Sequence, residues 1–160
     1  MSKEESETLN IAVIADTHGR FPESTWAALQ TADEIWHLGD FCDLATLERV
    51  KNLGRPVFAV LGNNDFGMDL PIHLLLERGG STFRLIHIPP PRPGGIDFVL
   101  HGHTHVPRDE KIGGTRVLNP GTIGKANKGA LPSWAWLRIT SGQSPIWEIV
   151  PVRENKNGRF

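Results

Sequence analysis

The chain has 160 residues, of which 39% are hydrophobic and 22% are charged, and its formal net charge is −1. This length suits one globular domain that buries roughly 70% of the surface of its unfolded chain. The small net charge provides no broad basic field for nucleic acid or an anionic membrane, and no apolar stretch approaches the ~20 residues of a membrane span.

The first sixty residues alternate between predicted strands and helices, which indicates a parallel sheet with crossover helices. The apolar run at 11–15 lacks strict alternation, as is typical of a strand that is covered on both faces. Pro22 lies just inside one helix start, and Asp43 is the predicted N-cap of the other helix. The expected elements are strands at 11–15, 34–38 and 57–61 and helices at 22–30 and 44–51.

The rest of the chain contains short strand candidates separated by glycine, proline, asparagine or serine. Gly79-Gly80 and Gly113-Gly114 predict hairpin turns. We therefore expect a second, largely antiparallel portion that packs against the first. Its strands are predicted at 72–76, 82–88, 98–100, 106–112, 115–118, 133–139 and 146–150.

The two ends of the chain lack apolar periodicity. We expect residues 1–8 and 153–160 to be flexible, around a single domain at 9–152. The acidic stretch Met1–Glu7 is unlike the start of a signal peptide. Cys42 is the only cysteine, so no intramolecular disulfide can form. Both features favour a cytoplasmic protein.

Four apolar runs end in side chains that can bind metals. Such side chains converge when strand ends meet at one edge of a sheet. Carboxylate, amide oxygen and neutral imidazole suit ions such as Mn²⁺, Fe, Zn²⁺ or Ni²⁺. Gly39, Gly62 and Gly102 would let the backbone approach closely or turn sharply beside these groups. In chain order, the four motifs are Asp16-x-His18, Gly39-Asp40, Gly62-Asn63 and Gly102-His103-x-His105.

This set and order of motifs resembles the calcineurin-like metallophosphoesterases, in particular their small bacterial and archaeal phosphodiesterase branch. The resemblance covers about residues 10–152. It implies an α/β fold, namely a four-layer α/β/β/α sandwich of two mixed β-sheets flanked by helices.

The resemblance also implies two divalent metal ions per chain, with Mn favoured and Fe, Ni, Zn or Mg as alternatives. One ion would be bound by Asp16, His18 and His105, and the second by Asn63, His87 and His103. Asp40 would bridge both ions, and Asp40, Asn63 and His103 would be catalytic. Two such ions and two aspartates leave a local charge of about +2, which attracts phosphate.

The implied function is hydrolysis of a small phosphoester, most specifically a phosphodiester, by in-line attack of a metal-bridging hydroxide. No membrane partner is expected, and nothing points strongly to nucleic acid. A catalytically weak metal-binding scaffold on the same fold and a single structural metal are the alternatives. Trp134 and Trp136 leave a homodimer open.

Two positions depart from the pattern of many relatives. Asn64 and Asp65 stand where those relatives have a histidine after Gly-Asn, as is also the case in the small phosphodiesterase branch. His87 leads into the segment 88–95, whose four prolines exclude a regular helix. We expect that segment to be an extended loop near the metals.

The remaining polar candidates have structural interpretations. His37 and His101 are expected to pack behind the metal ligands, and His73 to lie on the surface. Asp65 is expected to form a turn, with a catalytic role left open. Asn119-Pro120-Gly121-Thr122 predicts a tight turn between strands.

Overall fold

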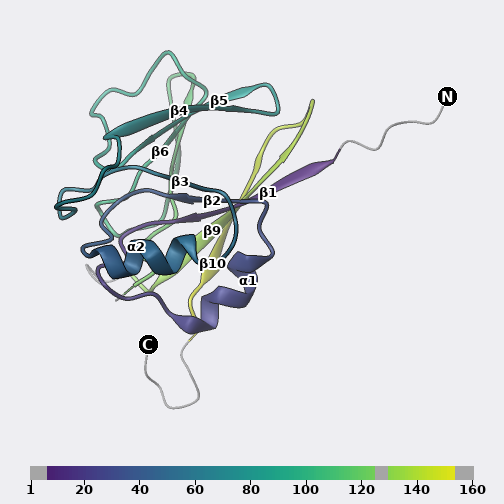
Figure 1. Ribbon diagram of the computed structural model, residues 1–160. Coiled ribbons are helices and arrows are strands. Elements are labelled where there is room, and N and C mark those ends of the chain that lie inside the picture. The colour runs from purple at the N-terminus through teal and green to yellow at the C-terminus, as the bar shows by residue number, and fades with distance from the viewer. Residues whose placement is uncertain (1–6, 125–129, 154–160) are drawn as a thin grey trace.

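The computed structural model describes residues 7–124 and 130–153, which form two five-stranded sheets packed against each other. Figure 1 shows the two helices on one side of the first sheet and β4, β5 and β6 on the other side. Of the ends predicted to be flexible, 1–8 and 153–160, residues 1–6 and 154–160 lie outside the described residues, and Thr8 is the first residue of a strand. The sandwich of two mixed sheets that the sequence predicted is confirmed.

The first sheet has the strand order β10-β9-β1-β2-β3. Strands β1, β2 and β3 are parallel to one another, as predicted. The hairpin of β9 and β10 adds to β1 in antiparallel orientation. The prediction that the later strands form a separate portion is therefore wrong for this hairpin. The bounds are β1 (Thr8–Ile14), β2 (Glu34–His37), β3 (Val57–Ala59), β9 (Ser133–Thr140) and β10 (Ile146–Pro151).

The second sheet has the strand order β4-β5-β6-β8-β7. Both predicted Gly-Gly turns are confirmed, since they join the hairpins β4–β5 and β7–β8. The pairs β5–β6 and β6–β8 are parallel, so this sheet is mixed rather than largely antiparallel. The bounds are β4 (His73–Arg78), β5 (Ser81–Ile86), β6 (Phe98–Leu100), β7 (Arg108–Ile112) and β8 (Thr115–Asn119).

The helices pack on the outer face of the first sheet. A 3₁₀ turn, η1 (Glu23–Thr25), leads into α1 (Trp26–Gln30). The second helix, α2 (Leu44–Lys51), begins after Asp43, whose Oδ1 accepts the Thr46 N–H at 2.7 Å and so confirms the predicted cap. Within the described ranges, no helix covers the outer face of the second sheet. The four prolines that follow His87 exclude a regular helix in that segment.

The side chains of β1 face two apolar layers. Ala12 and Ile14 pack toward the helices, together with Leu29 and Val50. The alternate residues Ile11, Val13 and Ala15 belong to the layer between the sheets. The sequence pattern of a strand covered on both faces is therefore confirmed, and the end of β1 is held firmly on both sides.

Two strands end earlier than the sequence indicates. β3 stops at Ala59, and the Leu61 N–H donates to the Pro71 carbonyl rather than continuing the sheet. β5 stops at Ile86, directly before His87. Both departures occur where the backbone leaves the sheet toward the candidate site.

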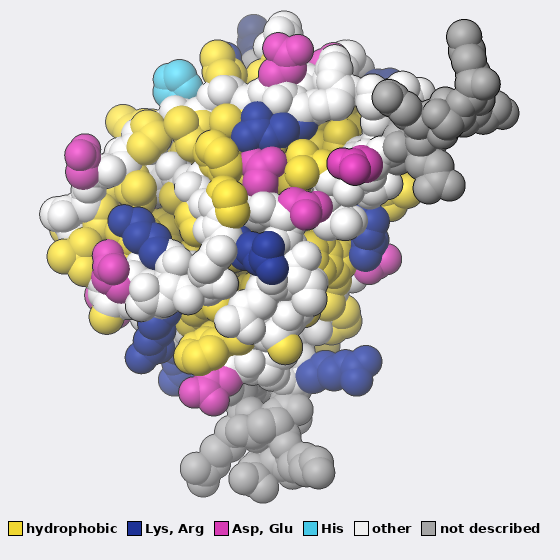
Figure 2. Space-filling model, turned by 45° about the vertical axis from the view of Figure 1, so that its right-hand side comes forward, with side chains coloured by type: hydrophobic (Ala, Val, Ile, Leu, Met, Phe, Trp, Pro, Cys, Tyr) yellow, Lys and Arg dark blue, Asp and Glu magenta, His cyan; other side chains and the backbone are white. Residues whose placement is uncertain are grey.

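The distribution of charge on the surface agrees with the small net charge of the chain. On the face shown in Figure 2, basic and acidic side chains are interspersed rather than gathered into regions of one sign. None of the helices in the part of the chain that the structure describes has the length and apolar character needed to cross a membrane.

Candidate metal centre

All seven predicted ligands lie at one edge of the sandwich, where strands of both sheets end. Backbone hydrogen bonds tie their loops together. The N–H groups of Asp16 and His18 donate to the carbonyls of Gly39 and Asp40, each at 3.0 Å. The Gly102 N–H donates to the His87 carbonyl at 3.1 Å and so links β5 to the loop after β6. The sites predicted from separate motifs thus become neighbours.

The first group of ligands surrounds one oxygen of Asp16. Its Oδ1 lies 3.4 Å from His105 Nε2 and 3.7 Å from His18 Nε2, and these two nitrogens are 3.1 Å apart. This oxygen is buried and has no hydrogen-bond partner among the described residues. A buried, unpaired carboxylate oxygen is costly. A cation held between Asp16 and the two imidazoles would remove that cost, so the residues fit a metal.

The second group lies around His87 and Asn63. His87 Nε2 is 2.9 Å from Asn63 Oδ1 and 3.3 Å from Asp40 Oδ2. His103 Nδ1 is 3.2 Å from the same asparagine oxygen. Asp40 Oδ2 also lies 3.5 Å from His18 Nε2 in the first group. Asp40 therefore stands between the two groups, where a bridging carboxylate would have to be.

A backbone contact fixes the orientation of His87. Its Nδ1 is 2.8 Å from the Leu38 carbonyl, which can only accept, so Nδ1 carries the proton and donates. The lone pair of Nε2 is then directed toward Asn63 and Asp40. Fixing the tautomer of a ligand histidine through its other nitrogen is a common feature of metal sites.

The two aspartates are held in the charged form. Burial acts to raise the pKa of Asp40, but the close approach of His87 and the hydrogen bonds from Asn64 hold it well below its usual range. Burial opposes ionisation of Asp16 in the same way, and its contacts with His105 and His18 bring its pKa below the ordinary value. The centre therefore presents two negative charges to a cation at neutral pH.

The histidines respond in the opposite direction. The nearby Asp16 carboxylate raises the pKa of His18 despite partial burial. Burial acts to lower the pKa of His87, but Asp40 and Asp16 together raise it. Protons therefore compete with metal ions for these nitrogens.

The backbone at the site is unusual. Five predicted ligands have φ between 47° and 72°, in the left-handed region that residues other than glycine rarely adopt. Such conformations concentrate at functional sites, where the surrounding structure holds them. The five are Asp16, His18, Asp40, His103 and His105.

The predicted glycines allow this close packing. A Cβ at Gly62 would collide with the backbone N and the Oδ1 of Asp40, and one at Gly102 would lie 2.9 Å from Asp16 Oδ2. A side chain at either position would therefore displace a predicted ligand.

Asp65 holds the loops rather than facing the centre. It is buried, and its carboxylate accepts the backbone N–H groups of Gly62, Asp40 and Cys42 at 2.8 to 2.9 Å. The prediction of a turn-forming residue is confirmed, although Asp65 also joins two separate loops. Its neighbour Asn64, which the sequence did not single out as a contact, donates to Asp40 through its backbone N–H and its Nδ2, each at 2.9 Å.

The two other buried histidines pack behind the ligands, as predicted. His37 stacks on Phe41 at 3.5 Å between ring centroids, and its Nδ1 accepts the Gly39 N–H at 3.0 Å. Burial lowers the pKa of His37 to about 3. Burial also lowers the pKa of His101 to about 4. Both rings are therefore neutral at pH 7. His73 is exposed, as expected.

Three contacts were missed by sequence reasoning. The segment 119–122 was predicted only as a turn, yet Thr122 Oγ1 donates to the Asp16 carbonyl at 2.9 Å, and Asn119 Nδ2 donates to Thr104 Oγ1 at 2.9 Å. Cys42 Sγ lies 3.2 Å from His18 Nδ1. The Asn-Pro-Gly sequence indicated a turn but neither of its two contacts, and nothing in the sequence indicated the contact of Cys42.

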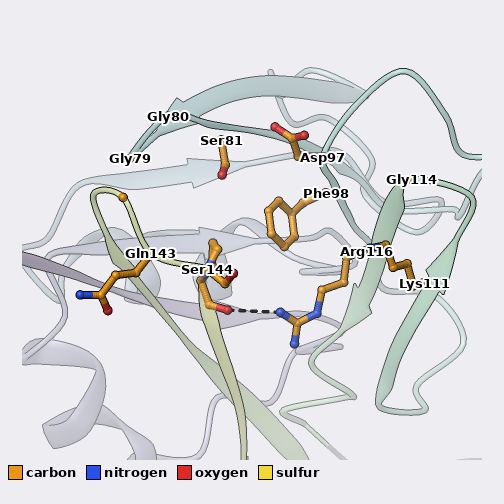
Figure 3. Close-up of a pocket in the computed structure, with 12 residues that line it drawn as sticks. Gly79, Gly80, Ser81, Asp97, Phe98, Lys111, Gly114, Arg116, Gln143 and Ser144 are labelled. Atoms are coloured by element: carbon orange, nitrogen blue, oxygen red, sulfur yellow. Dashed lines mark hydrogen bonds between the residues drawn. The ribbon is translucent and has the colours of Figure 1, made fainter.

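A large cavity lined by described residues lies away from this centre. It measures about 570 Å³ and lies where β5, β6 and β8 begin, at the opposite end of the strands (Figure 3). Its Arg116 is already bound to Asp109 at 2.8 and 2.9 Å and to the Pro145 carbonyl at 3.2 Å. A smaller cavity of about 270 Å³ touches Asn63 and His87 directly.

Known proteins share both the sequence pattern and the fold. The family model described as calcineurin-like phosphoesterase superfamily domain matches residues 9–142. A probable metallophosphoesterase of Methanocaldococcus jannaschii is 32% identical over 133 residues, which cover 72% of this chain and 68% of the relative. A phosphodiesterase of the same organism is 25% identical over 142 residues, covering 71% and 83%.

The solved structures agree on the fold. Vps29 of Chaetomium thermophilum superposes with a TM-score of 0.81 at 19% identity, covering 94% of this chain and 92% of that protein. At this identity the similarity establishes the architecture alone.

Proposed function

Since the chain belongs to the calcineurin-like phosphoesterase superfamily, we propose that it hydrolyses a phosphodiester with two divalent metal ions. The observation that supports this proposal is that Asp40 lies between two groups of donors. One of these groups contains the buried Asp16 Oδ1, which has no hydrogen-bond partner among the described residues.

The donor sets divide as the motifs suggested. Asp16, His18 and His105 would hold one ion, and the other predicted ligands would hold the second, with Asp40 shared. Bound there, the ions would lower the pKa of a water molecule and offset charge on the phosphate. We favour manganese, because oxygen and imidazole donors suit it, with iron, nickel, zinc or magnesium as alternatives.

Two of the three residues assigned to catalysis combine a donor role with access to solvent. Asn63 is exposed and His103 is half-buried, so both can face a substrate. Asp40 is buried between the two donor groups and supplies negative charge to hold both ions. Its contacts with Asn64 fix the position of its two oxygens.

Preference for a diester has support from the surrounding charges. Within the described ranges, no lysine or arginine forms a hydrogen bond or ion pair with any of the seven predicted ligands. A monoester carries an additional negative charge, which a cationic side chain would stabilise. A diester needs less such help. The name of the phosphodiesterase relative points the same way.

Metal counting together with hydrolysis tests this function. Protein stripped of metal and reloaded with Mn²⁺ should bind two ions per chain by elemental analysis and cleave bis(p-nitrophenyl) phosphate faster than p-nitrophenyl phosphate. Asp40→Asn should lower kcat/KM at least ~100-fold, because it removes charge shared by both ions. Asp69→Asn, at an exposed position, is the matched control. Two bound ions without turnover of either compound would contradict the proposal.

The second candidate is a metal-binding scaffold, which the exposed apolar Ile72 and Leu75 favour. It predicts a stoichiometric protein complex that persists in the Asp40→Asn variant, and no hydrolysis by the metal-loaded wild type. Sedimentation of the isolated chain would show whether the partner is a second copy. We also expect a reducing compartment such as the cytoplasm, because the single cysteine cannot form an intramolecular disulfide.

A further inference from the structure

An apolar cavity of about 270 Å³ opens directly beside two predicted ligands. Asn63 and His87 are its only polar side chains, and they form the wall nearest the candidate metals. The other side chains are hydrocarbon, and we call them the isoleucine pocket. It consists of Leu61, Ile72, Ile86 and Ile88, with Gly62 at its base.

The strand pattern does not require these residues to be apolar. On β5, Phe83 and Leu85 face the core between the sheets, whereas Ile86 is only half-buried. Ile72 is 66% exposed and Ile88 is 51% exposed. Positions that face water usually carry polar side chains, and exposed apolar groups that gather around a cavity mark binding sites. The fold alone therefore does not explain this pocket.

The walls of the pocket are held in place. The Leu61 N–H donates to the Pro71 carbonyl at 2.7 Å, which joins the residues on either side of the β3–β4 connection. Ile88 precedes Pro89, and a residue before proline is restricted to extended conformations. Little ordering is then needed when a ligand enters, which favours binding.

We propose that the isoleucine pocket binds an apolar ring or alkyl group attached to the phosphodiester, so that such substrates are selected. This inference rests on the proposed function. A phosphate at the candidate centre would place one ester group beside Asn63 and His87, at the mouth of the pocket. The volume is below the ~300 Å³ at which sites enclose a whole drug-sized ligand, so the pocket suits one part of a substrate.

The test compares two diesters that share a leaving group, p-nitrophenyl phenyl phosphate and p-nitrophenyl methyl phosphate. The double variant Ile72→Ser/Ile88→Ser alters only exposed positions. It should lower kcat/KM for the phenyl ester roughly tenfold and leave the methyl ester within about twofold, because the non-leaving phenyl group fills the pocket whereas a methyl group in its place is too small to do so. Leu131→Ser is the control, since Leu131 is 74% exposed and does not line the pocket.

Binding gives a second measurement that does not depend on turnover. By calorimetry, the Mn²⁺-loaded wild type should bind diphenyl phosphate more tightly than dimethyl phosphate, and the double variant should lose that preference. If the double variant lowers kcat/KM or affinity equally for both esters, or leaves the ratio between the two esters unchanged, the pocket proposal is overturned but the proposed function stays intact. If the ratio between the esters is unchanged but the double variant self-associates differently from the wild type, the isoleucine pocket is part of an interface between copies of the chain. That result would also overturn the pocket proposal. No turnover of either ester by the metal-loaded wild type overturns both proposals.

Discussion

At the scale of single residues, the Cys42 thiol shows how a ligand can be oriented from behind. Burial raises its pKa to about 11, so the thiol is neutral, and its sulfur can accept the N–H of His18 Nδ1. This contact leaves His18 Nε2 facing Asp16 and His105. Partners of this kind fix the tautomer and the ring position of a metal ligand.

Cys42→Ala should therefore weaken metal binding by roughly tenfold, the lower end of the effect expected for such partners. Cys42→Ser keeps a hydroxyl oxygen that can accept the N–H of His18 and should lose less. Titration of Mn²⁺ against a competing chelator measures both variants. Equal affinity in the wild type and Cys42→Ala would show that the thiol has no orienting role.

His37 provides a test of pH dependence. Its folded pKa of about 3 lies below the value of 6.5 expected in the unfolded chain. As pH falls below about 6.5, the unfolded chain binds a proton that the folded protein excludes, so stability is lost until pH reaches about 3. At pH 5, which is ~1.5 pH units below the unfolded-state pKa, the loss of folding stability is about 2 kcal/mol.

Denaturant unfolding of the metal-free protein at pH 7 and pH 5 measures this loss. The His37→Gln variant should show a smaller fall between the two pH values than the wild type, by about 2 kcal/mol. His73→Gln, at an exposed histidine, should behave like the wild type. Identical pH dependence in all three proteins would rule out His37 as the source.

At the scale of elements, a local sequence signal was sufficient to predict where α2 begins. Asp43 accepts the Thr46 N–H, and its pKa is lowered by that bond. Asp43→Ala should lower the free energy of unfolding by about 1 kcal/mol, whereas Asp43→Asn should retain most of the cap. Chemical denaturation at neutral pH compares the two, and equal losses would argue against capping.

Whether a strand's place in a sheet could be predicted depends on how far apart in sequence the paired residues are. The hairpins at Gly79-Gly80 and Gly113-Gly114 were predictable because the turn and its two strands are adjacent in sequence. The β9–β10 hairpin was also visible as two strands, but its place beside β1 was not. Pairing of Ile11 with Leu137 depends on residues more than a hundred positions apart, and no local pattern encodes it.

At the scale of the whole molecule, the candidate centre joins both sheets. Asp16, Asp40 and Asn63 follow strands of the first sheet, and His87 and His103 follow strands of the second. An unfolded chain cannot hold these groups together, so metal binding favours the folded state. Metal at 100 times its Kd adds about 2.7 kcal/mol of stability.

Addition of Mn²⁺ to the stripped protein should therefore raise Tm by roughly 5–10 °C for a domain of this size. A chelator should reverse the shift, as scanning calorimetry can show. Asp40→Asn should reduce the shift, and Asp69→Asn should not. A Tm that is insensitive to metal would mean that the two sheets are not joined through bound ions.

The sequence alone determined the types, order and spacing of seven candidate ligands, the start of α2 and both Gly-Gly turns, because caps, turns and strand ends act over a few residues. Whether the seven bind metal stays a prediction, although the structure brings them together. Only the tertiary structure decided that Asp16 Oδ1 lacks a partner, that Cys42 meets His18 and that an apolar pocket adjoins His87. Each of these depends on groups that are distant in sequence and meet only when the two sheets pack.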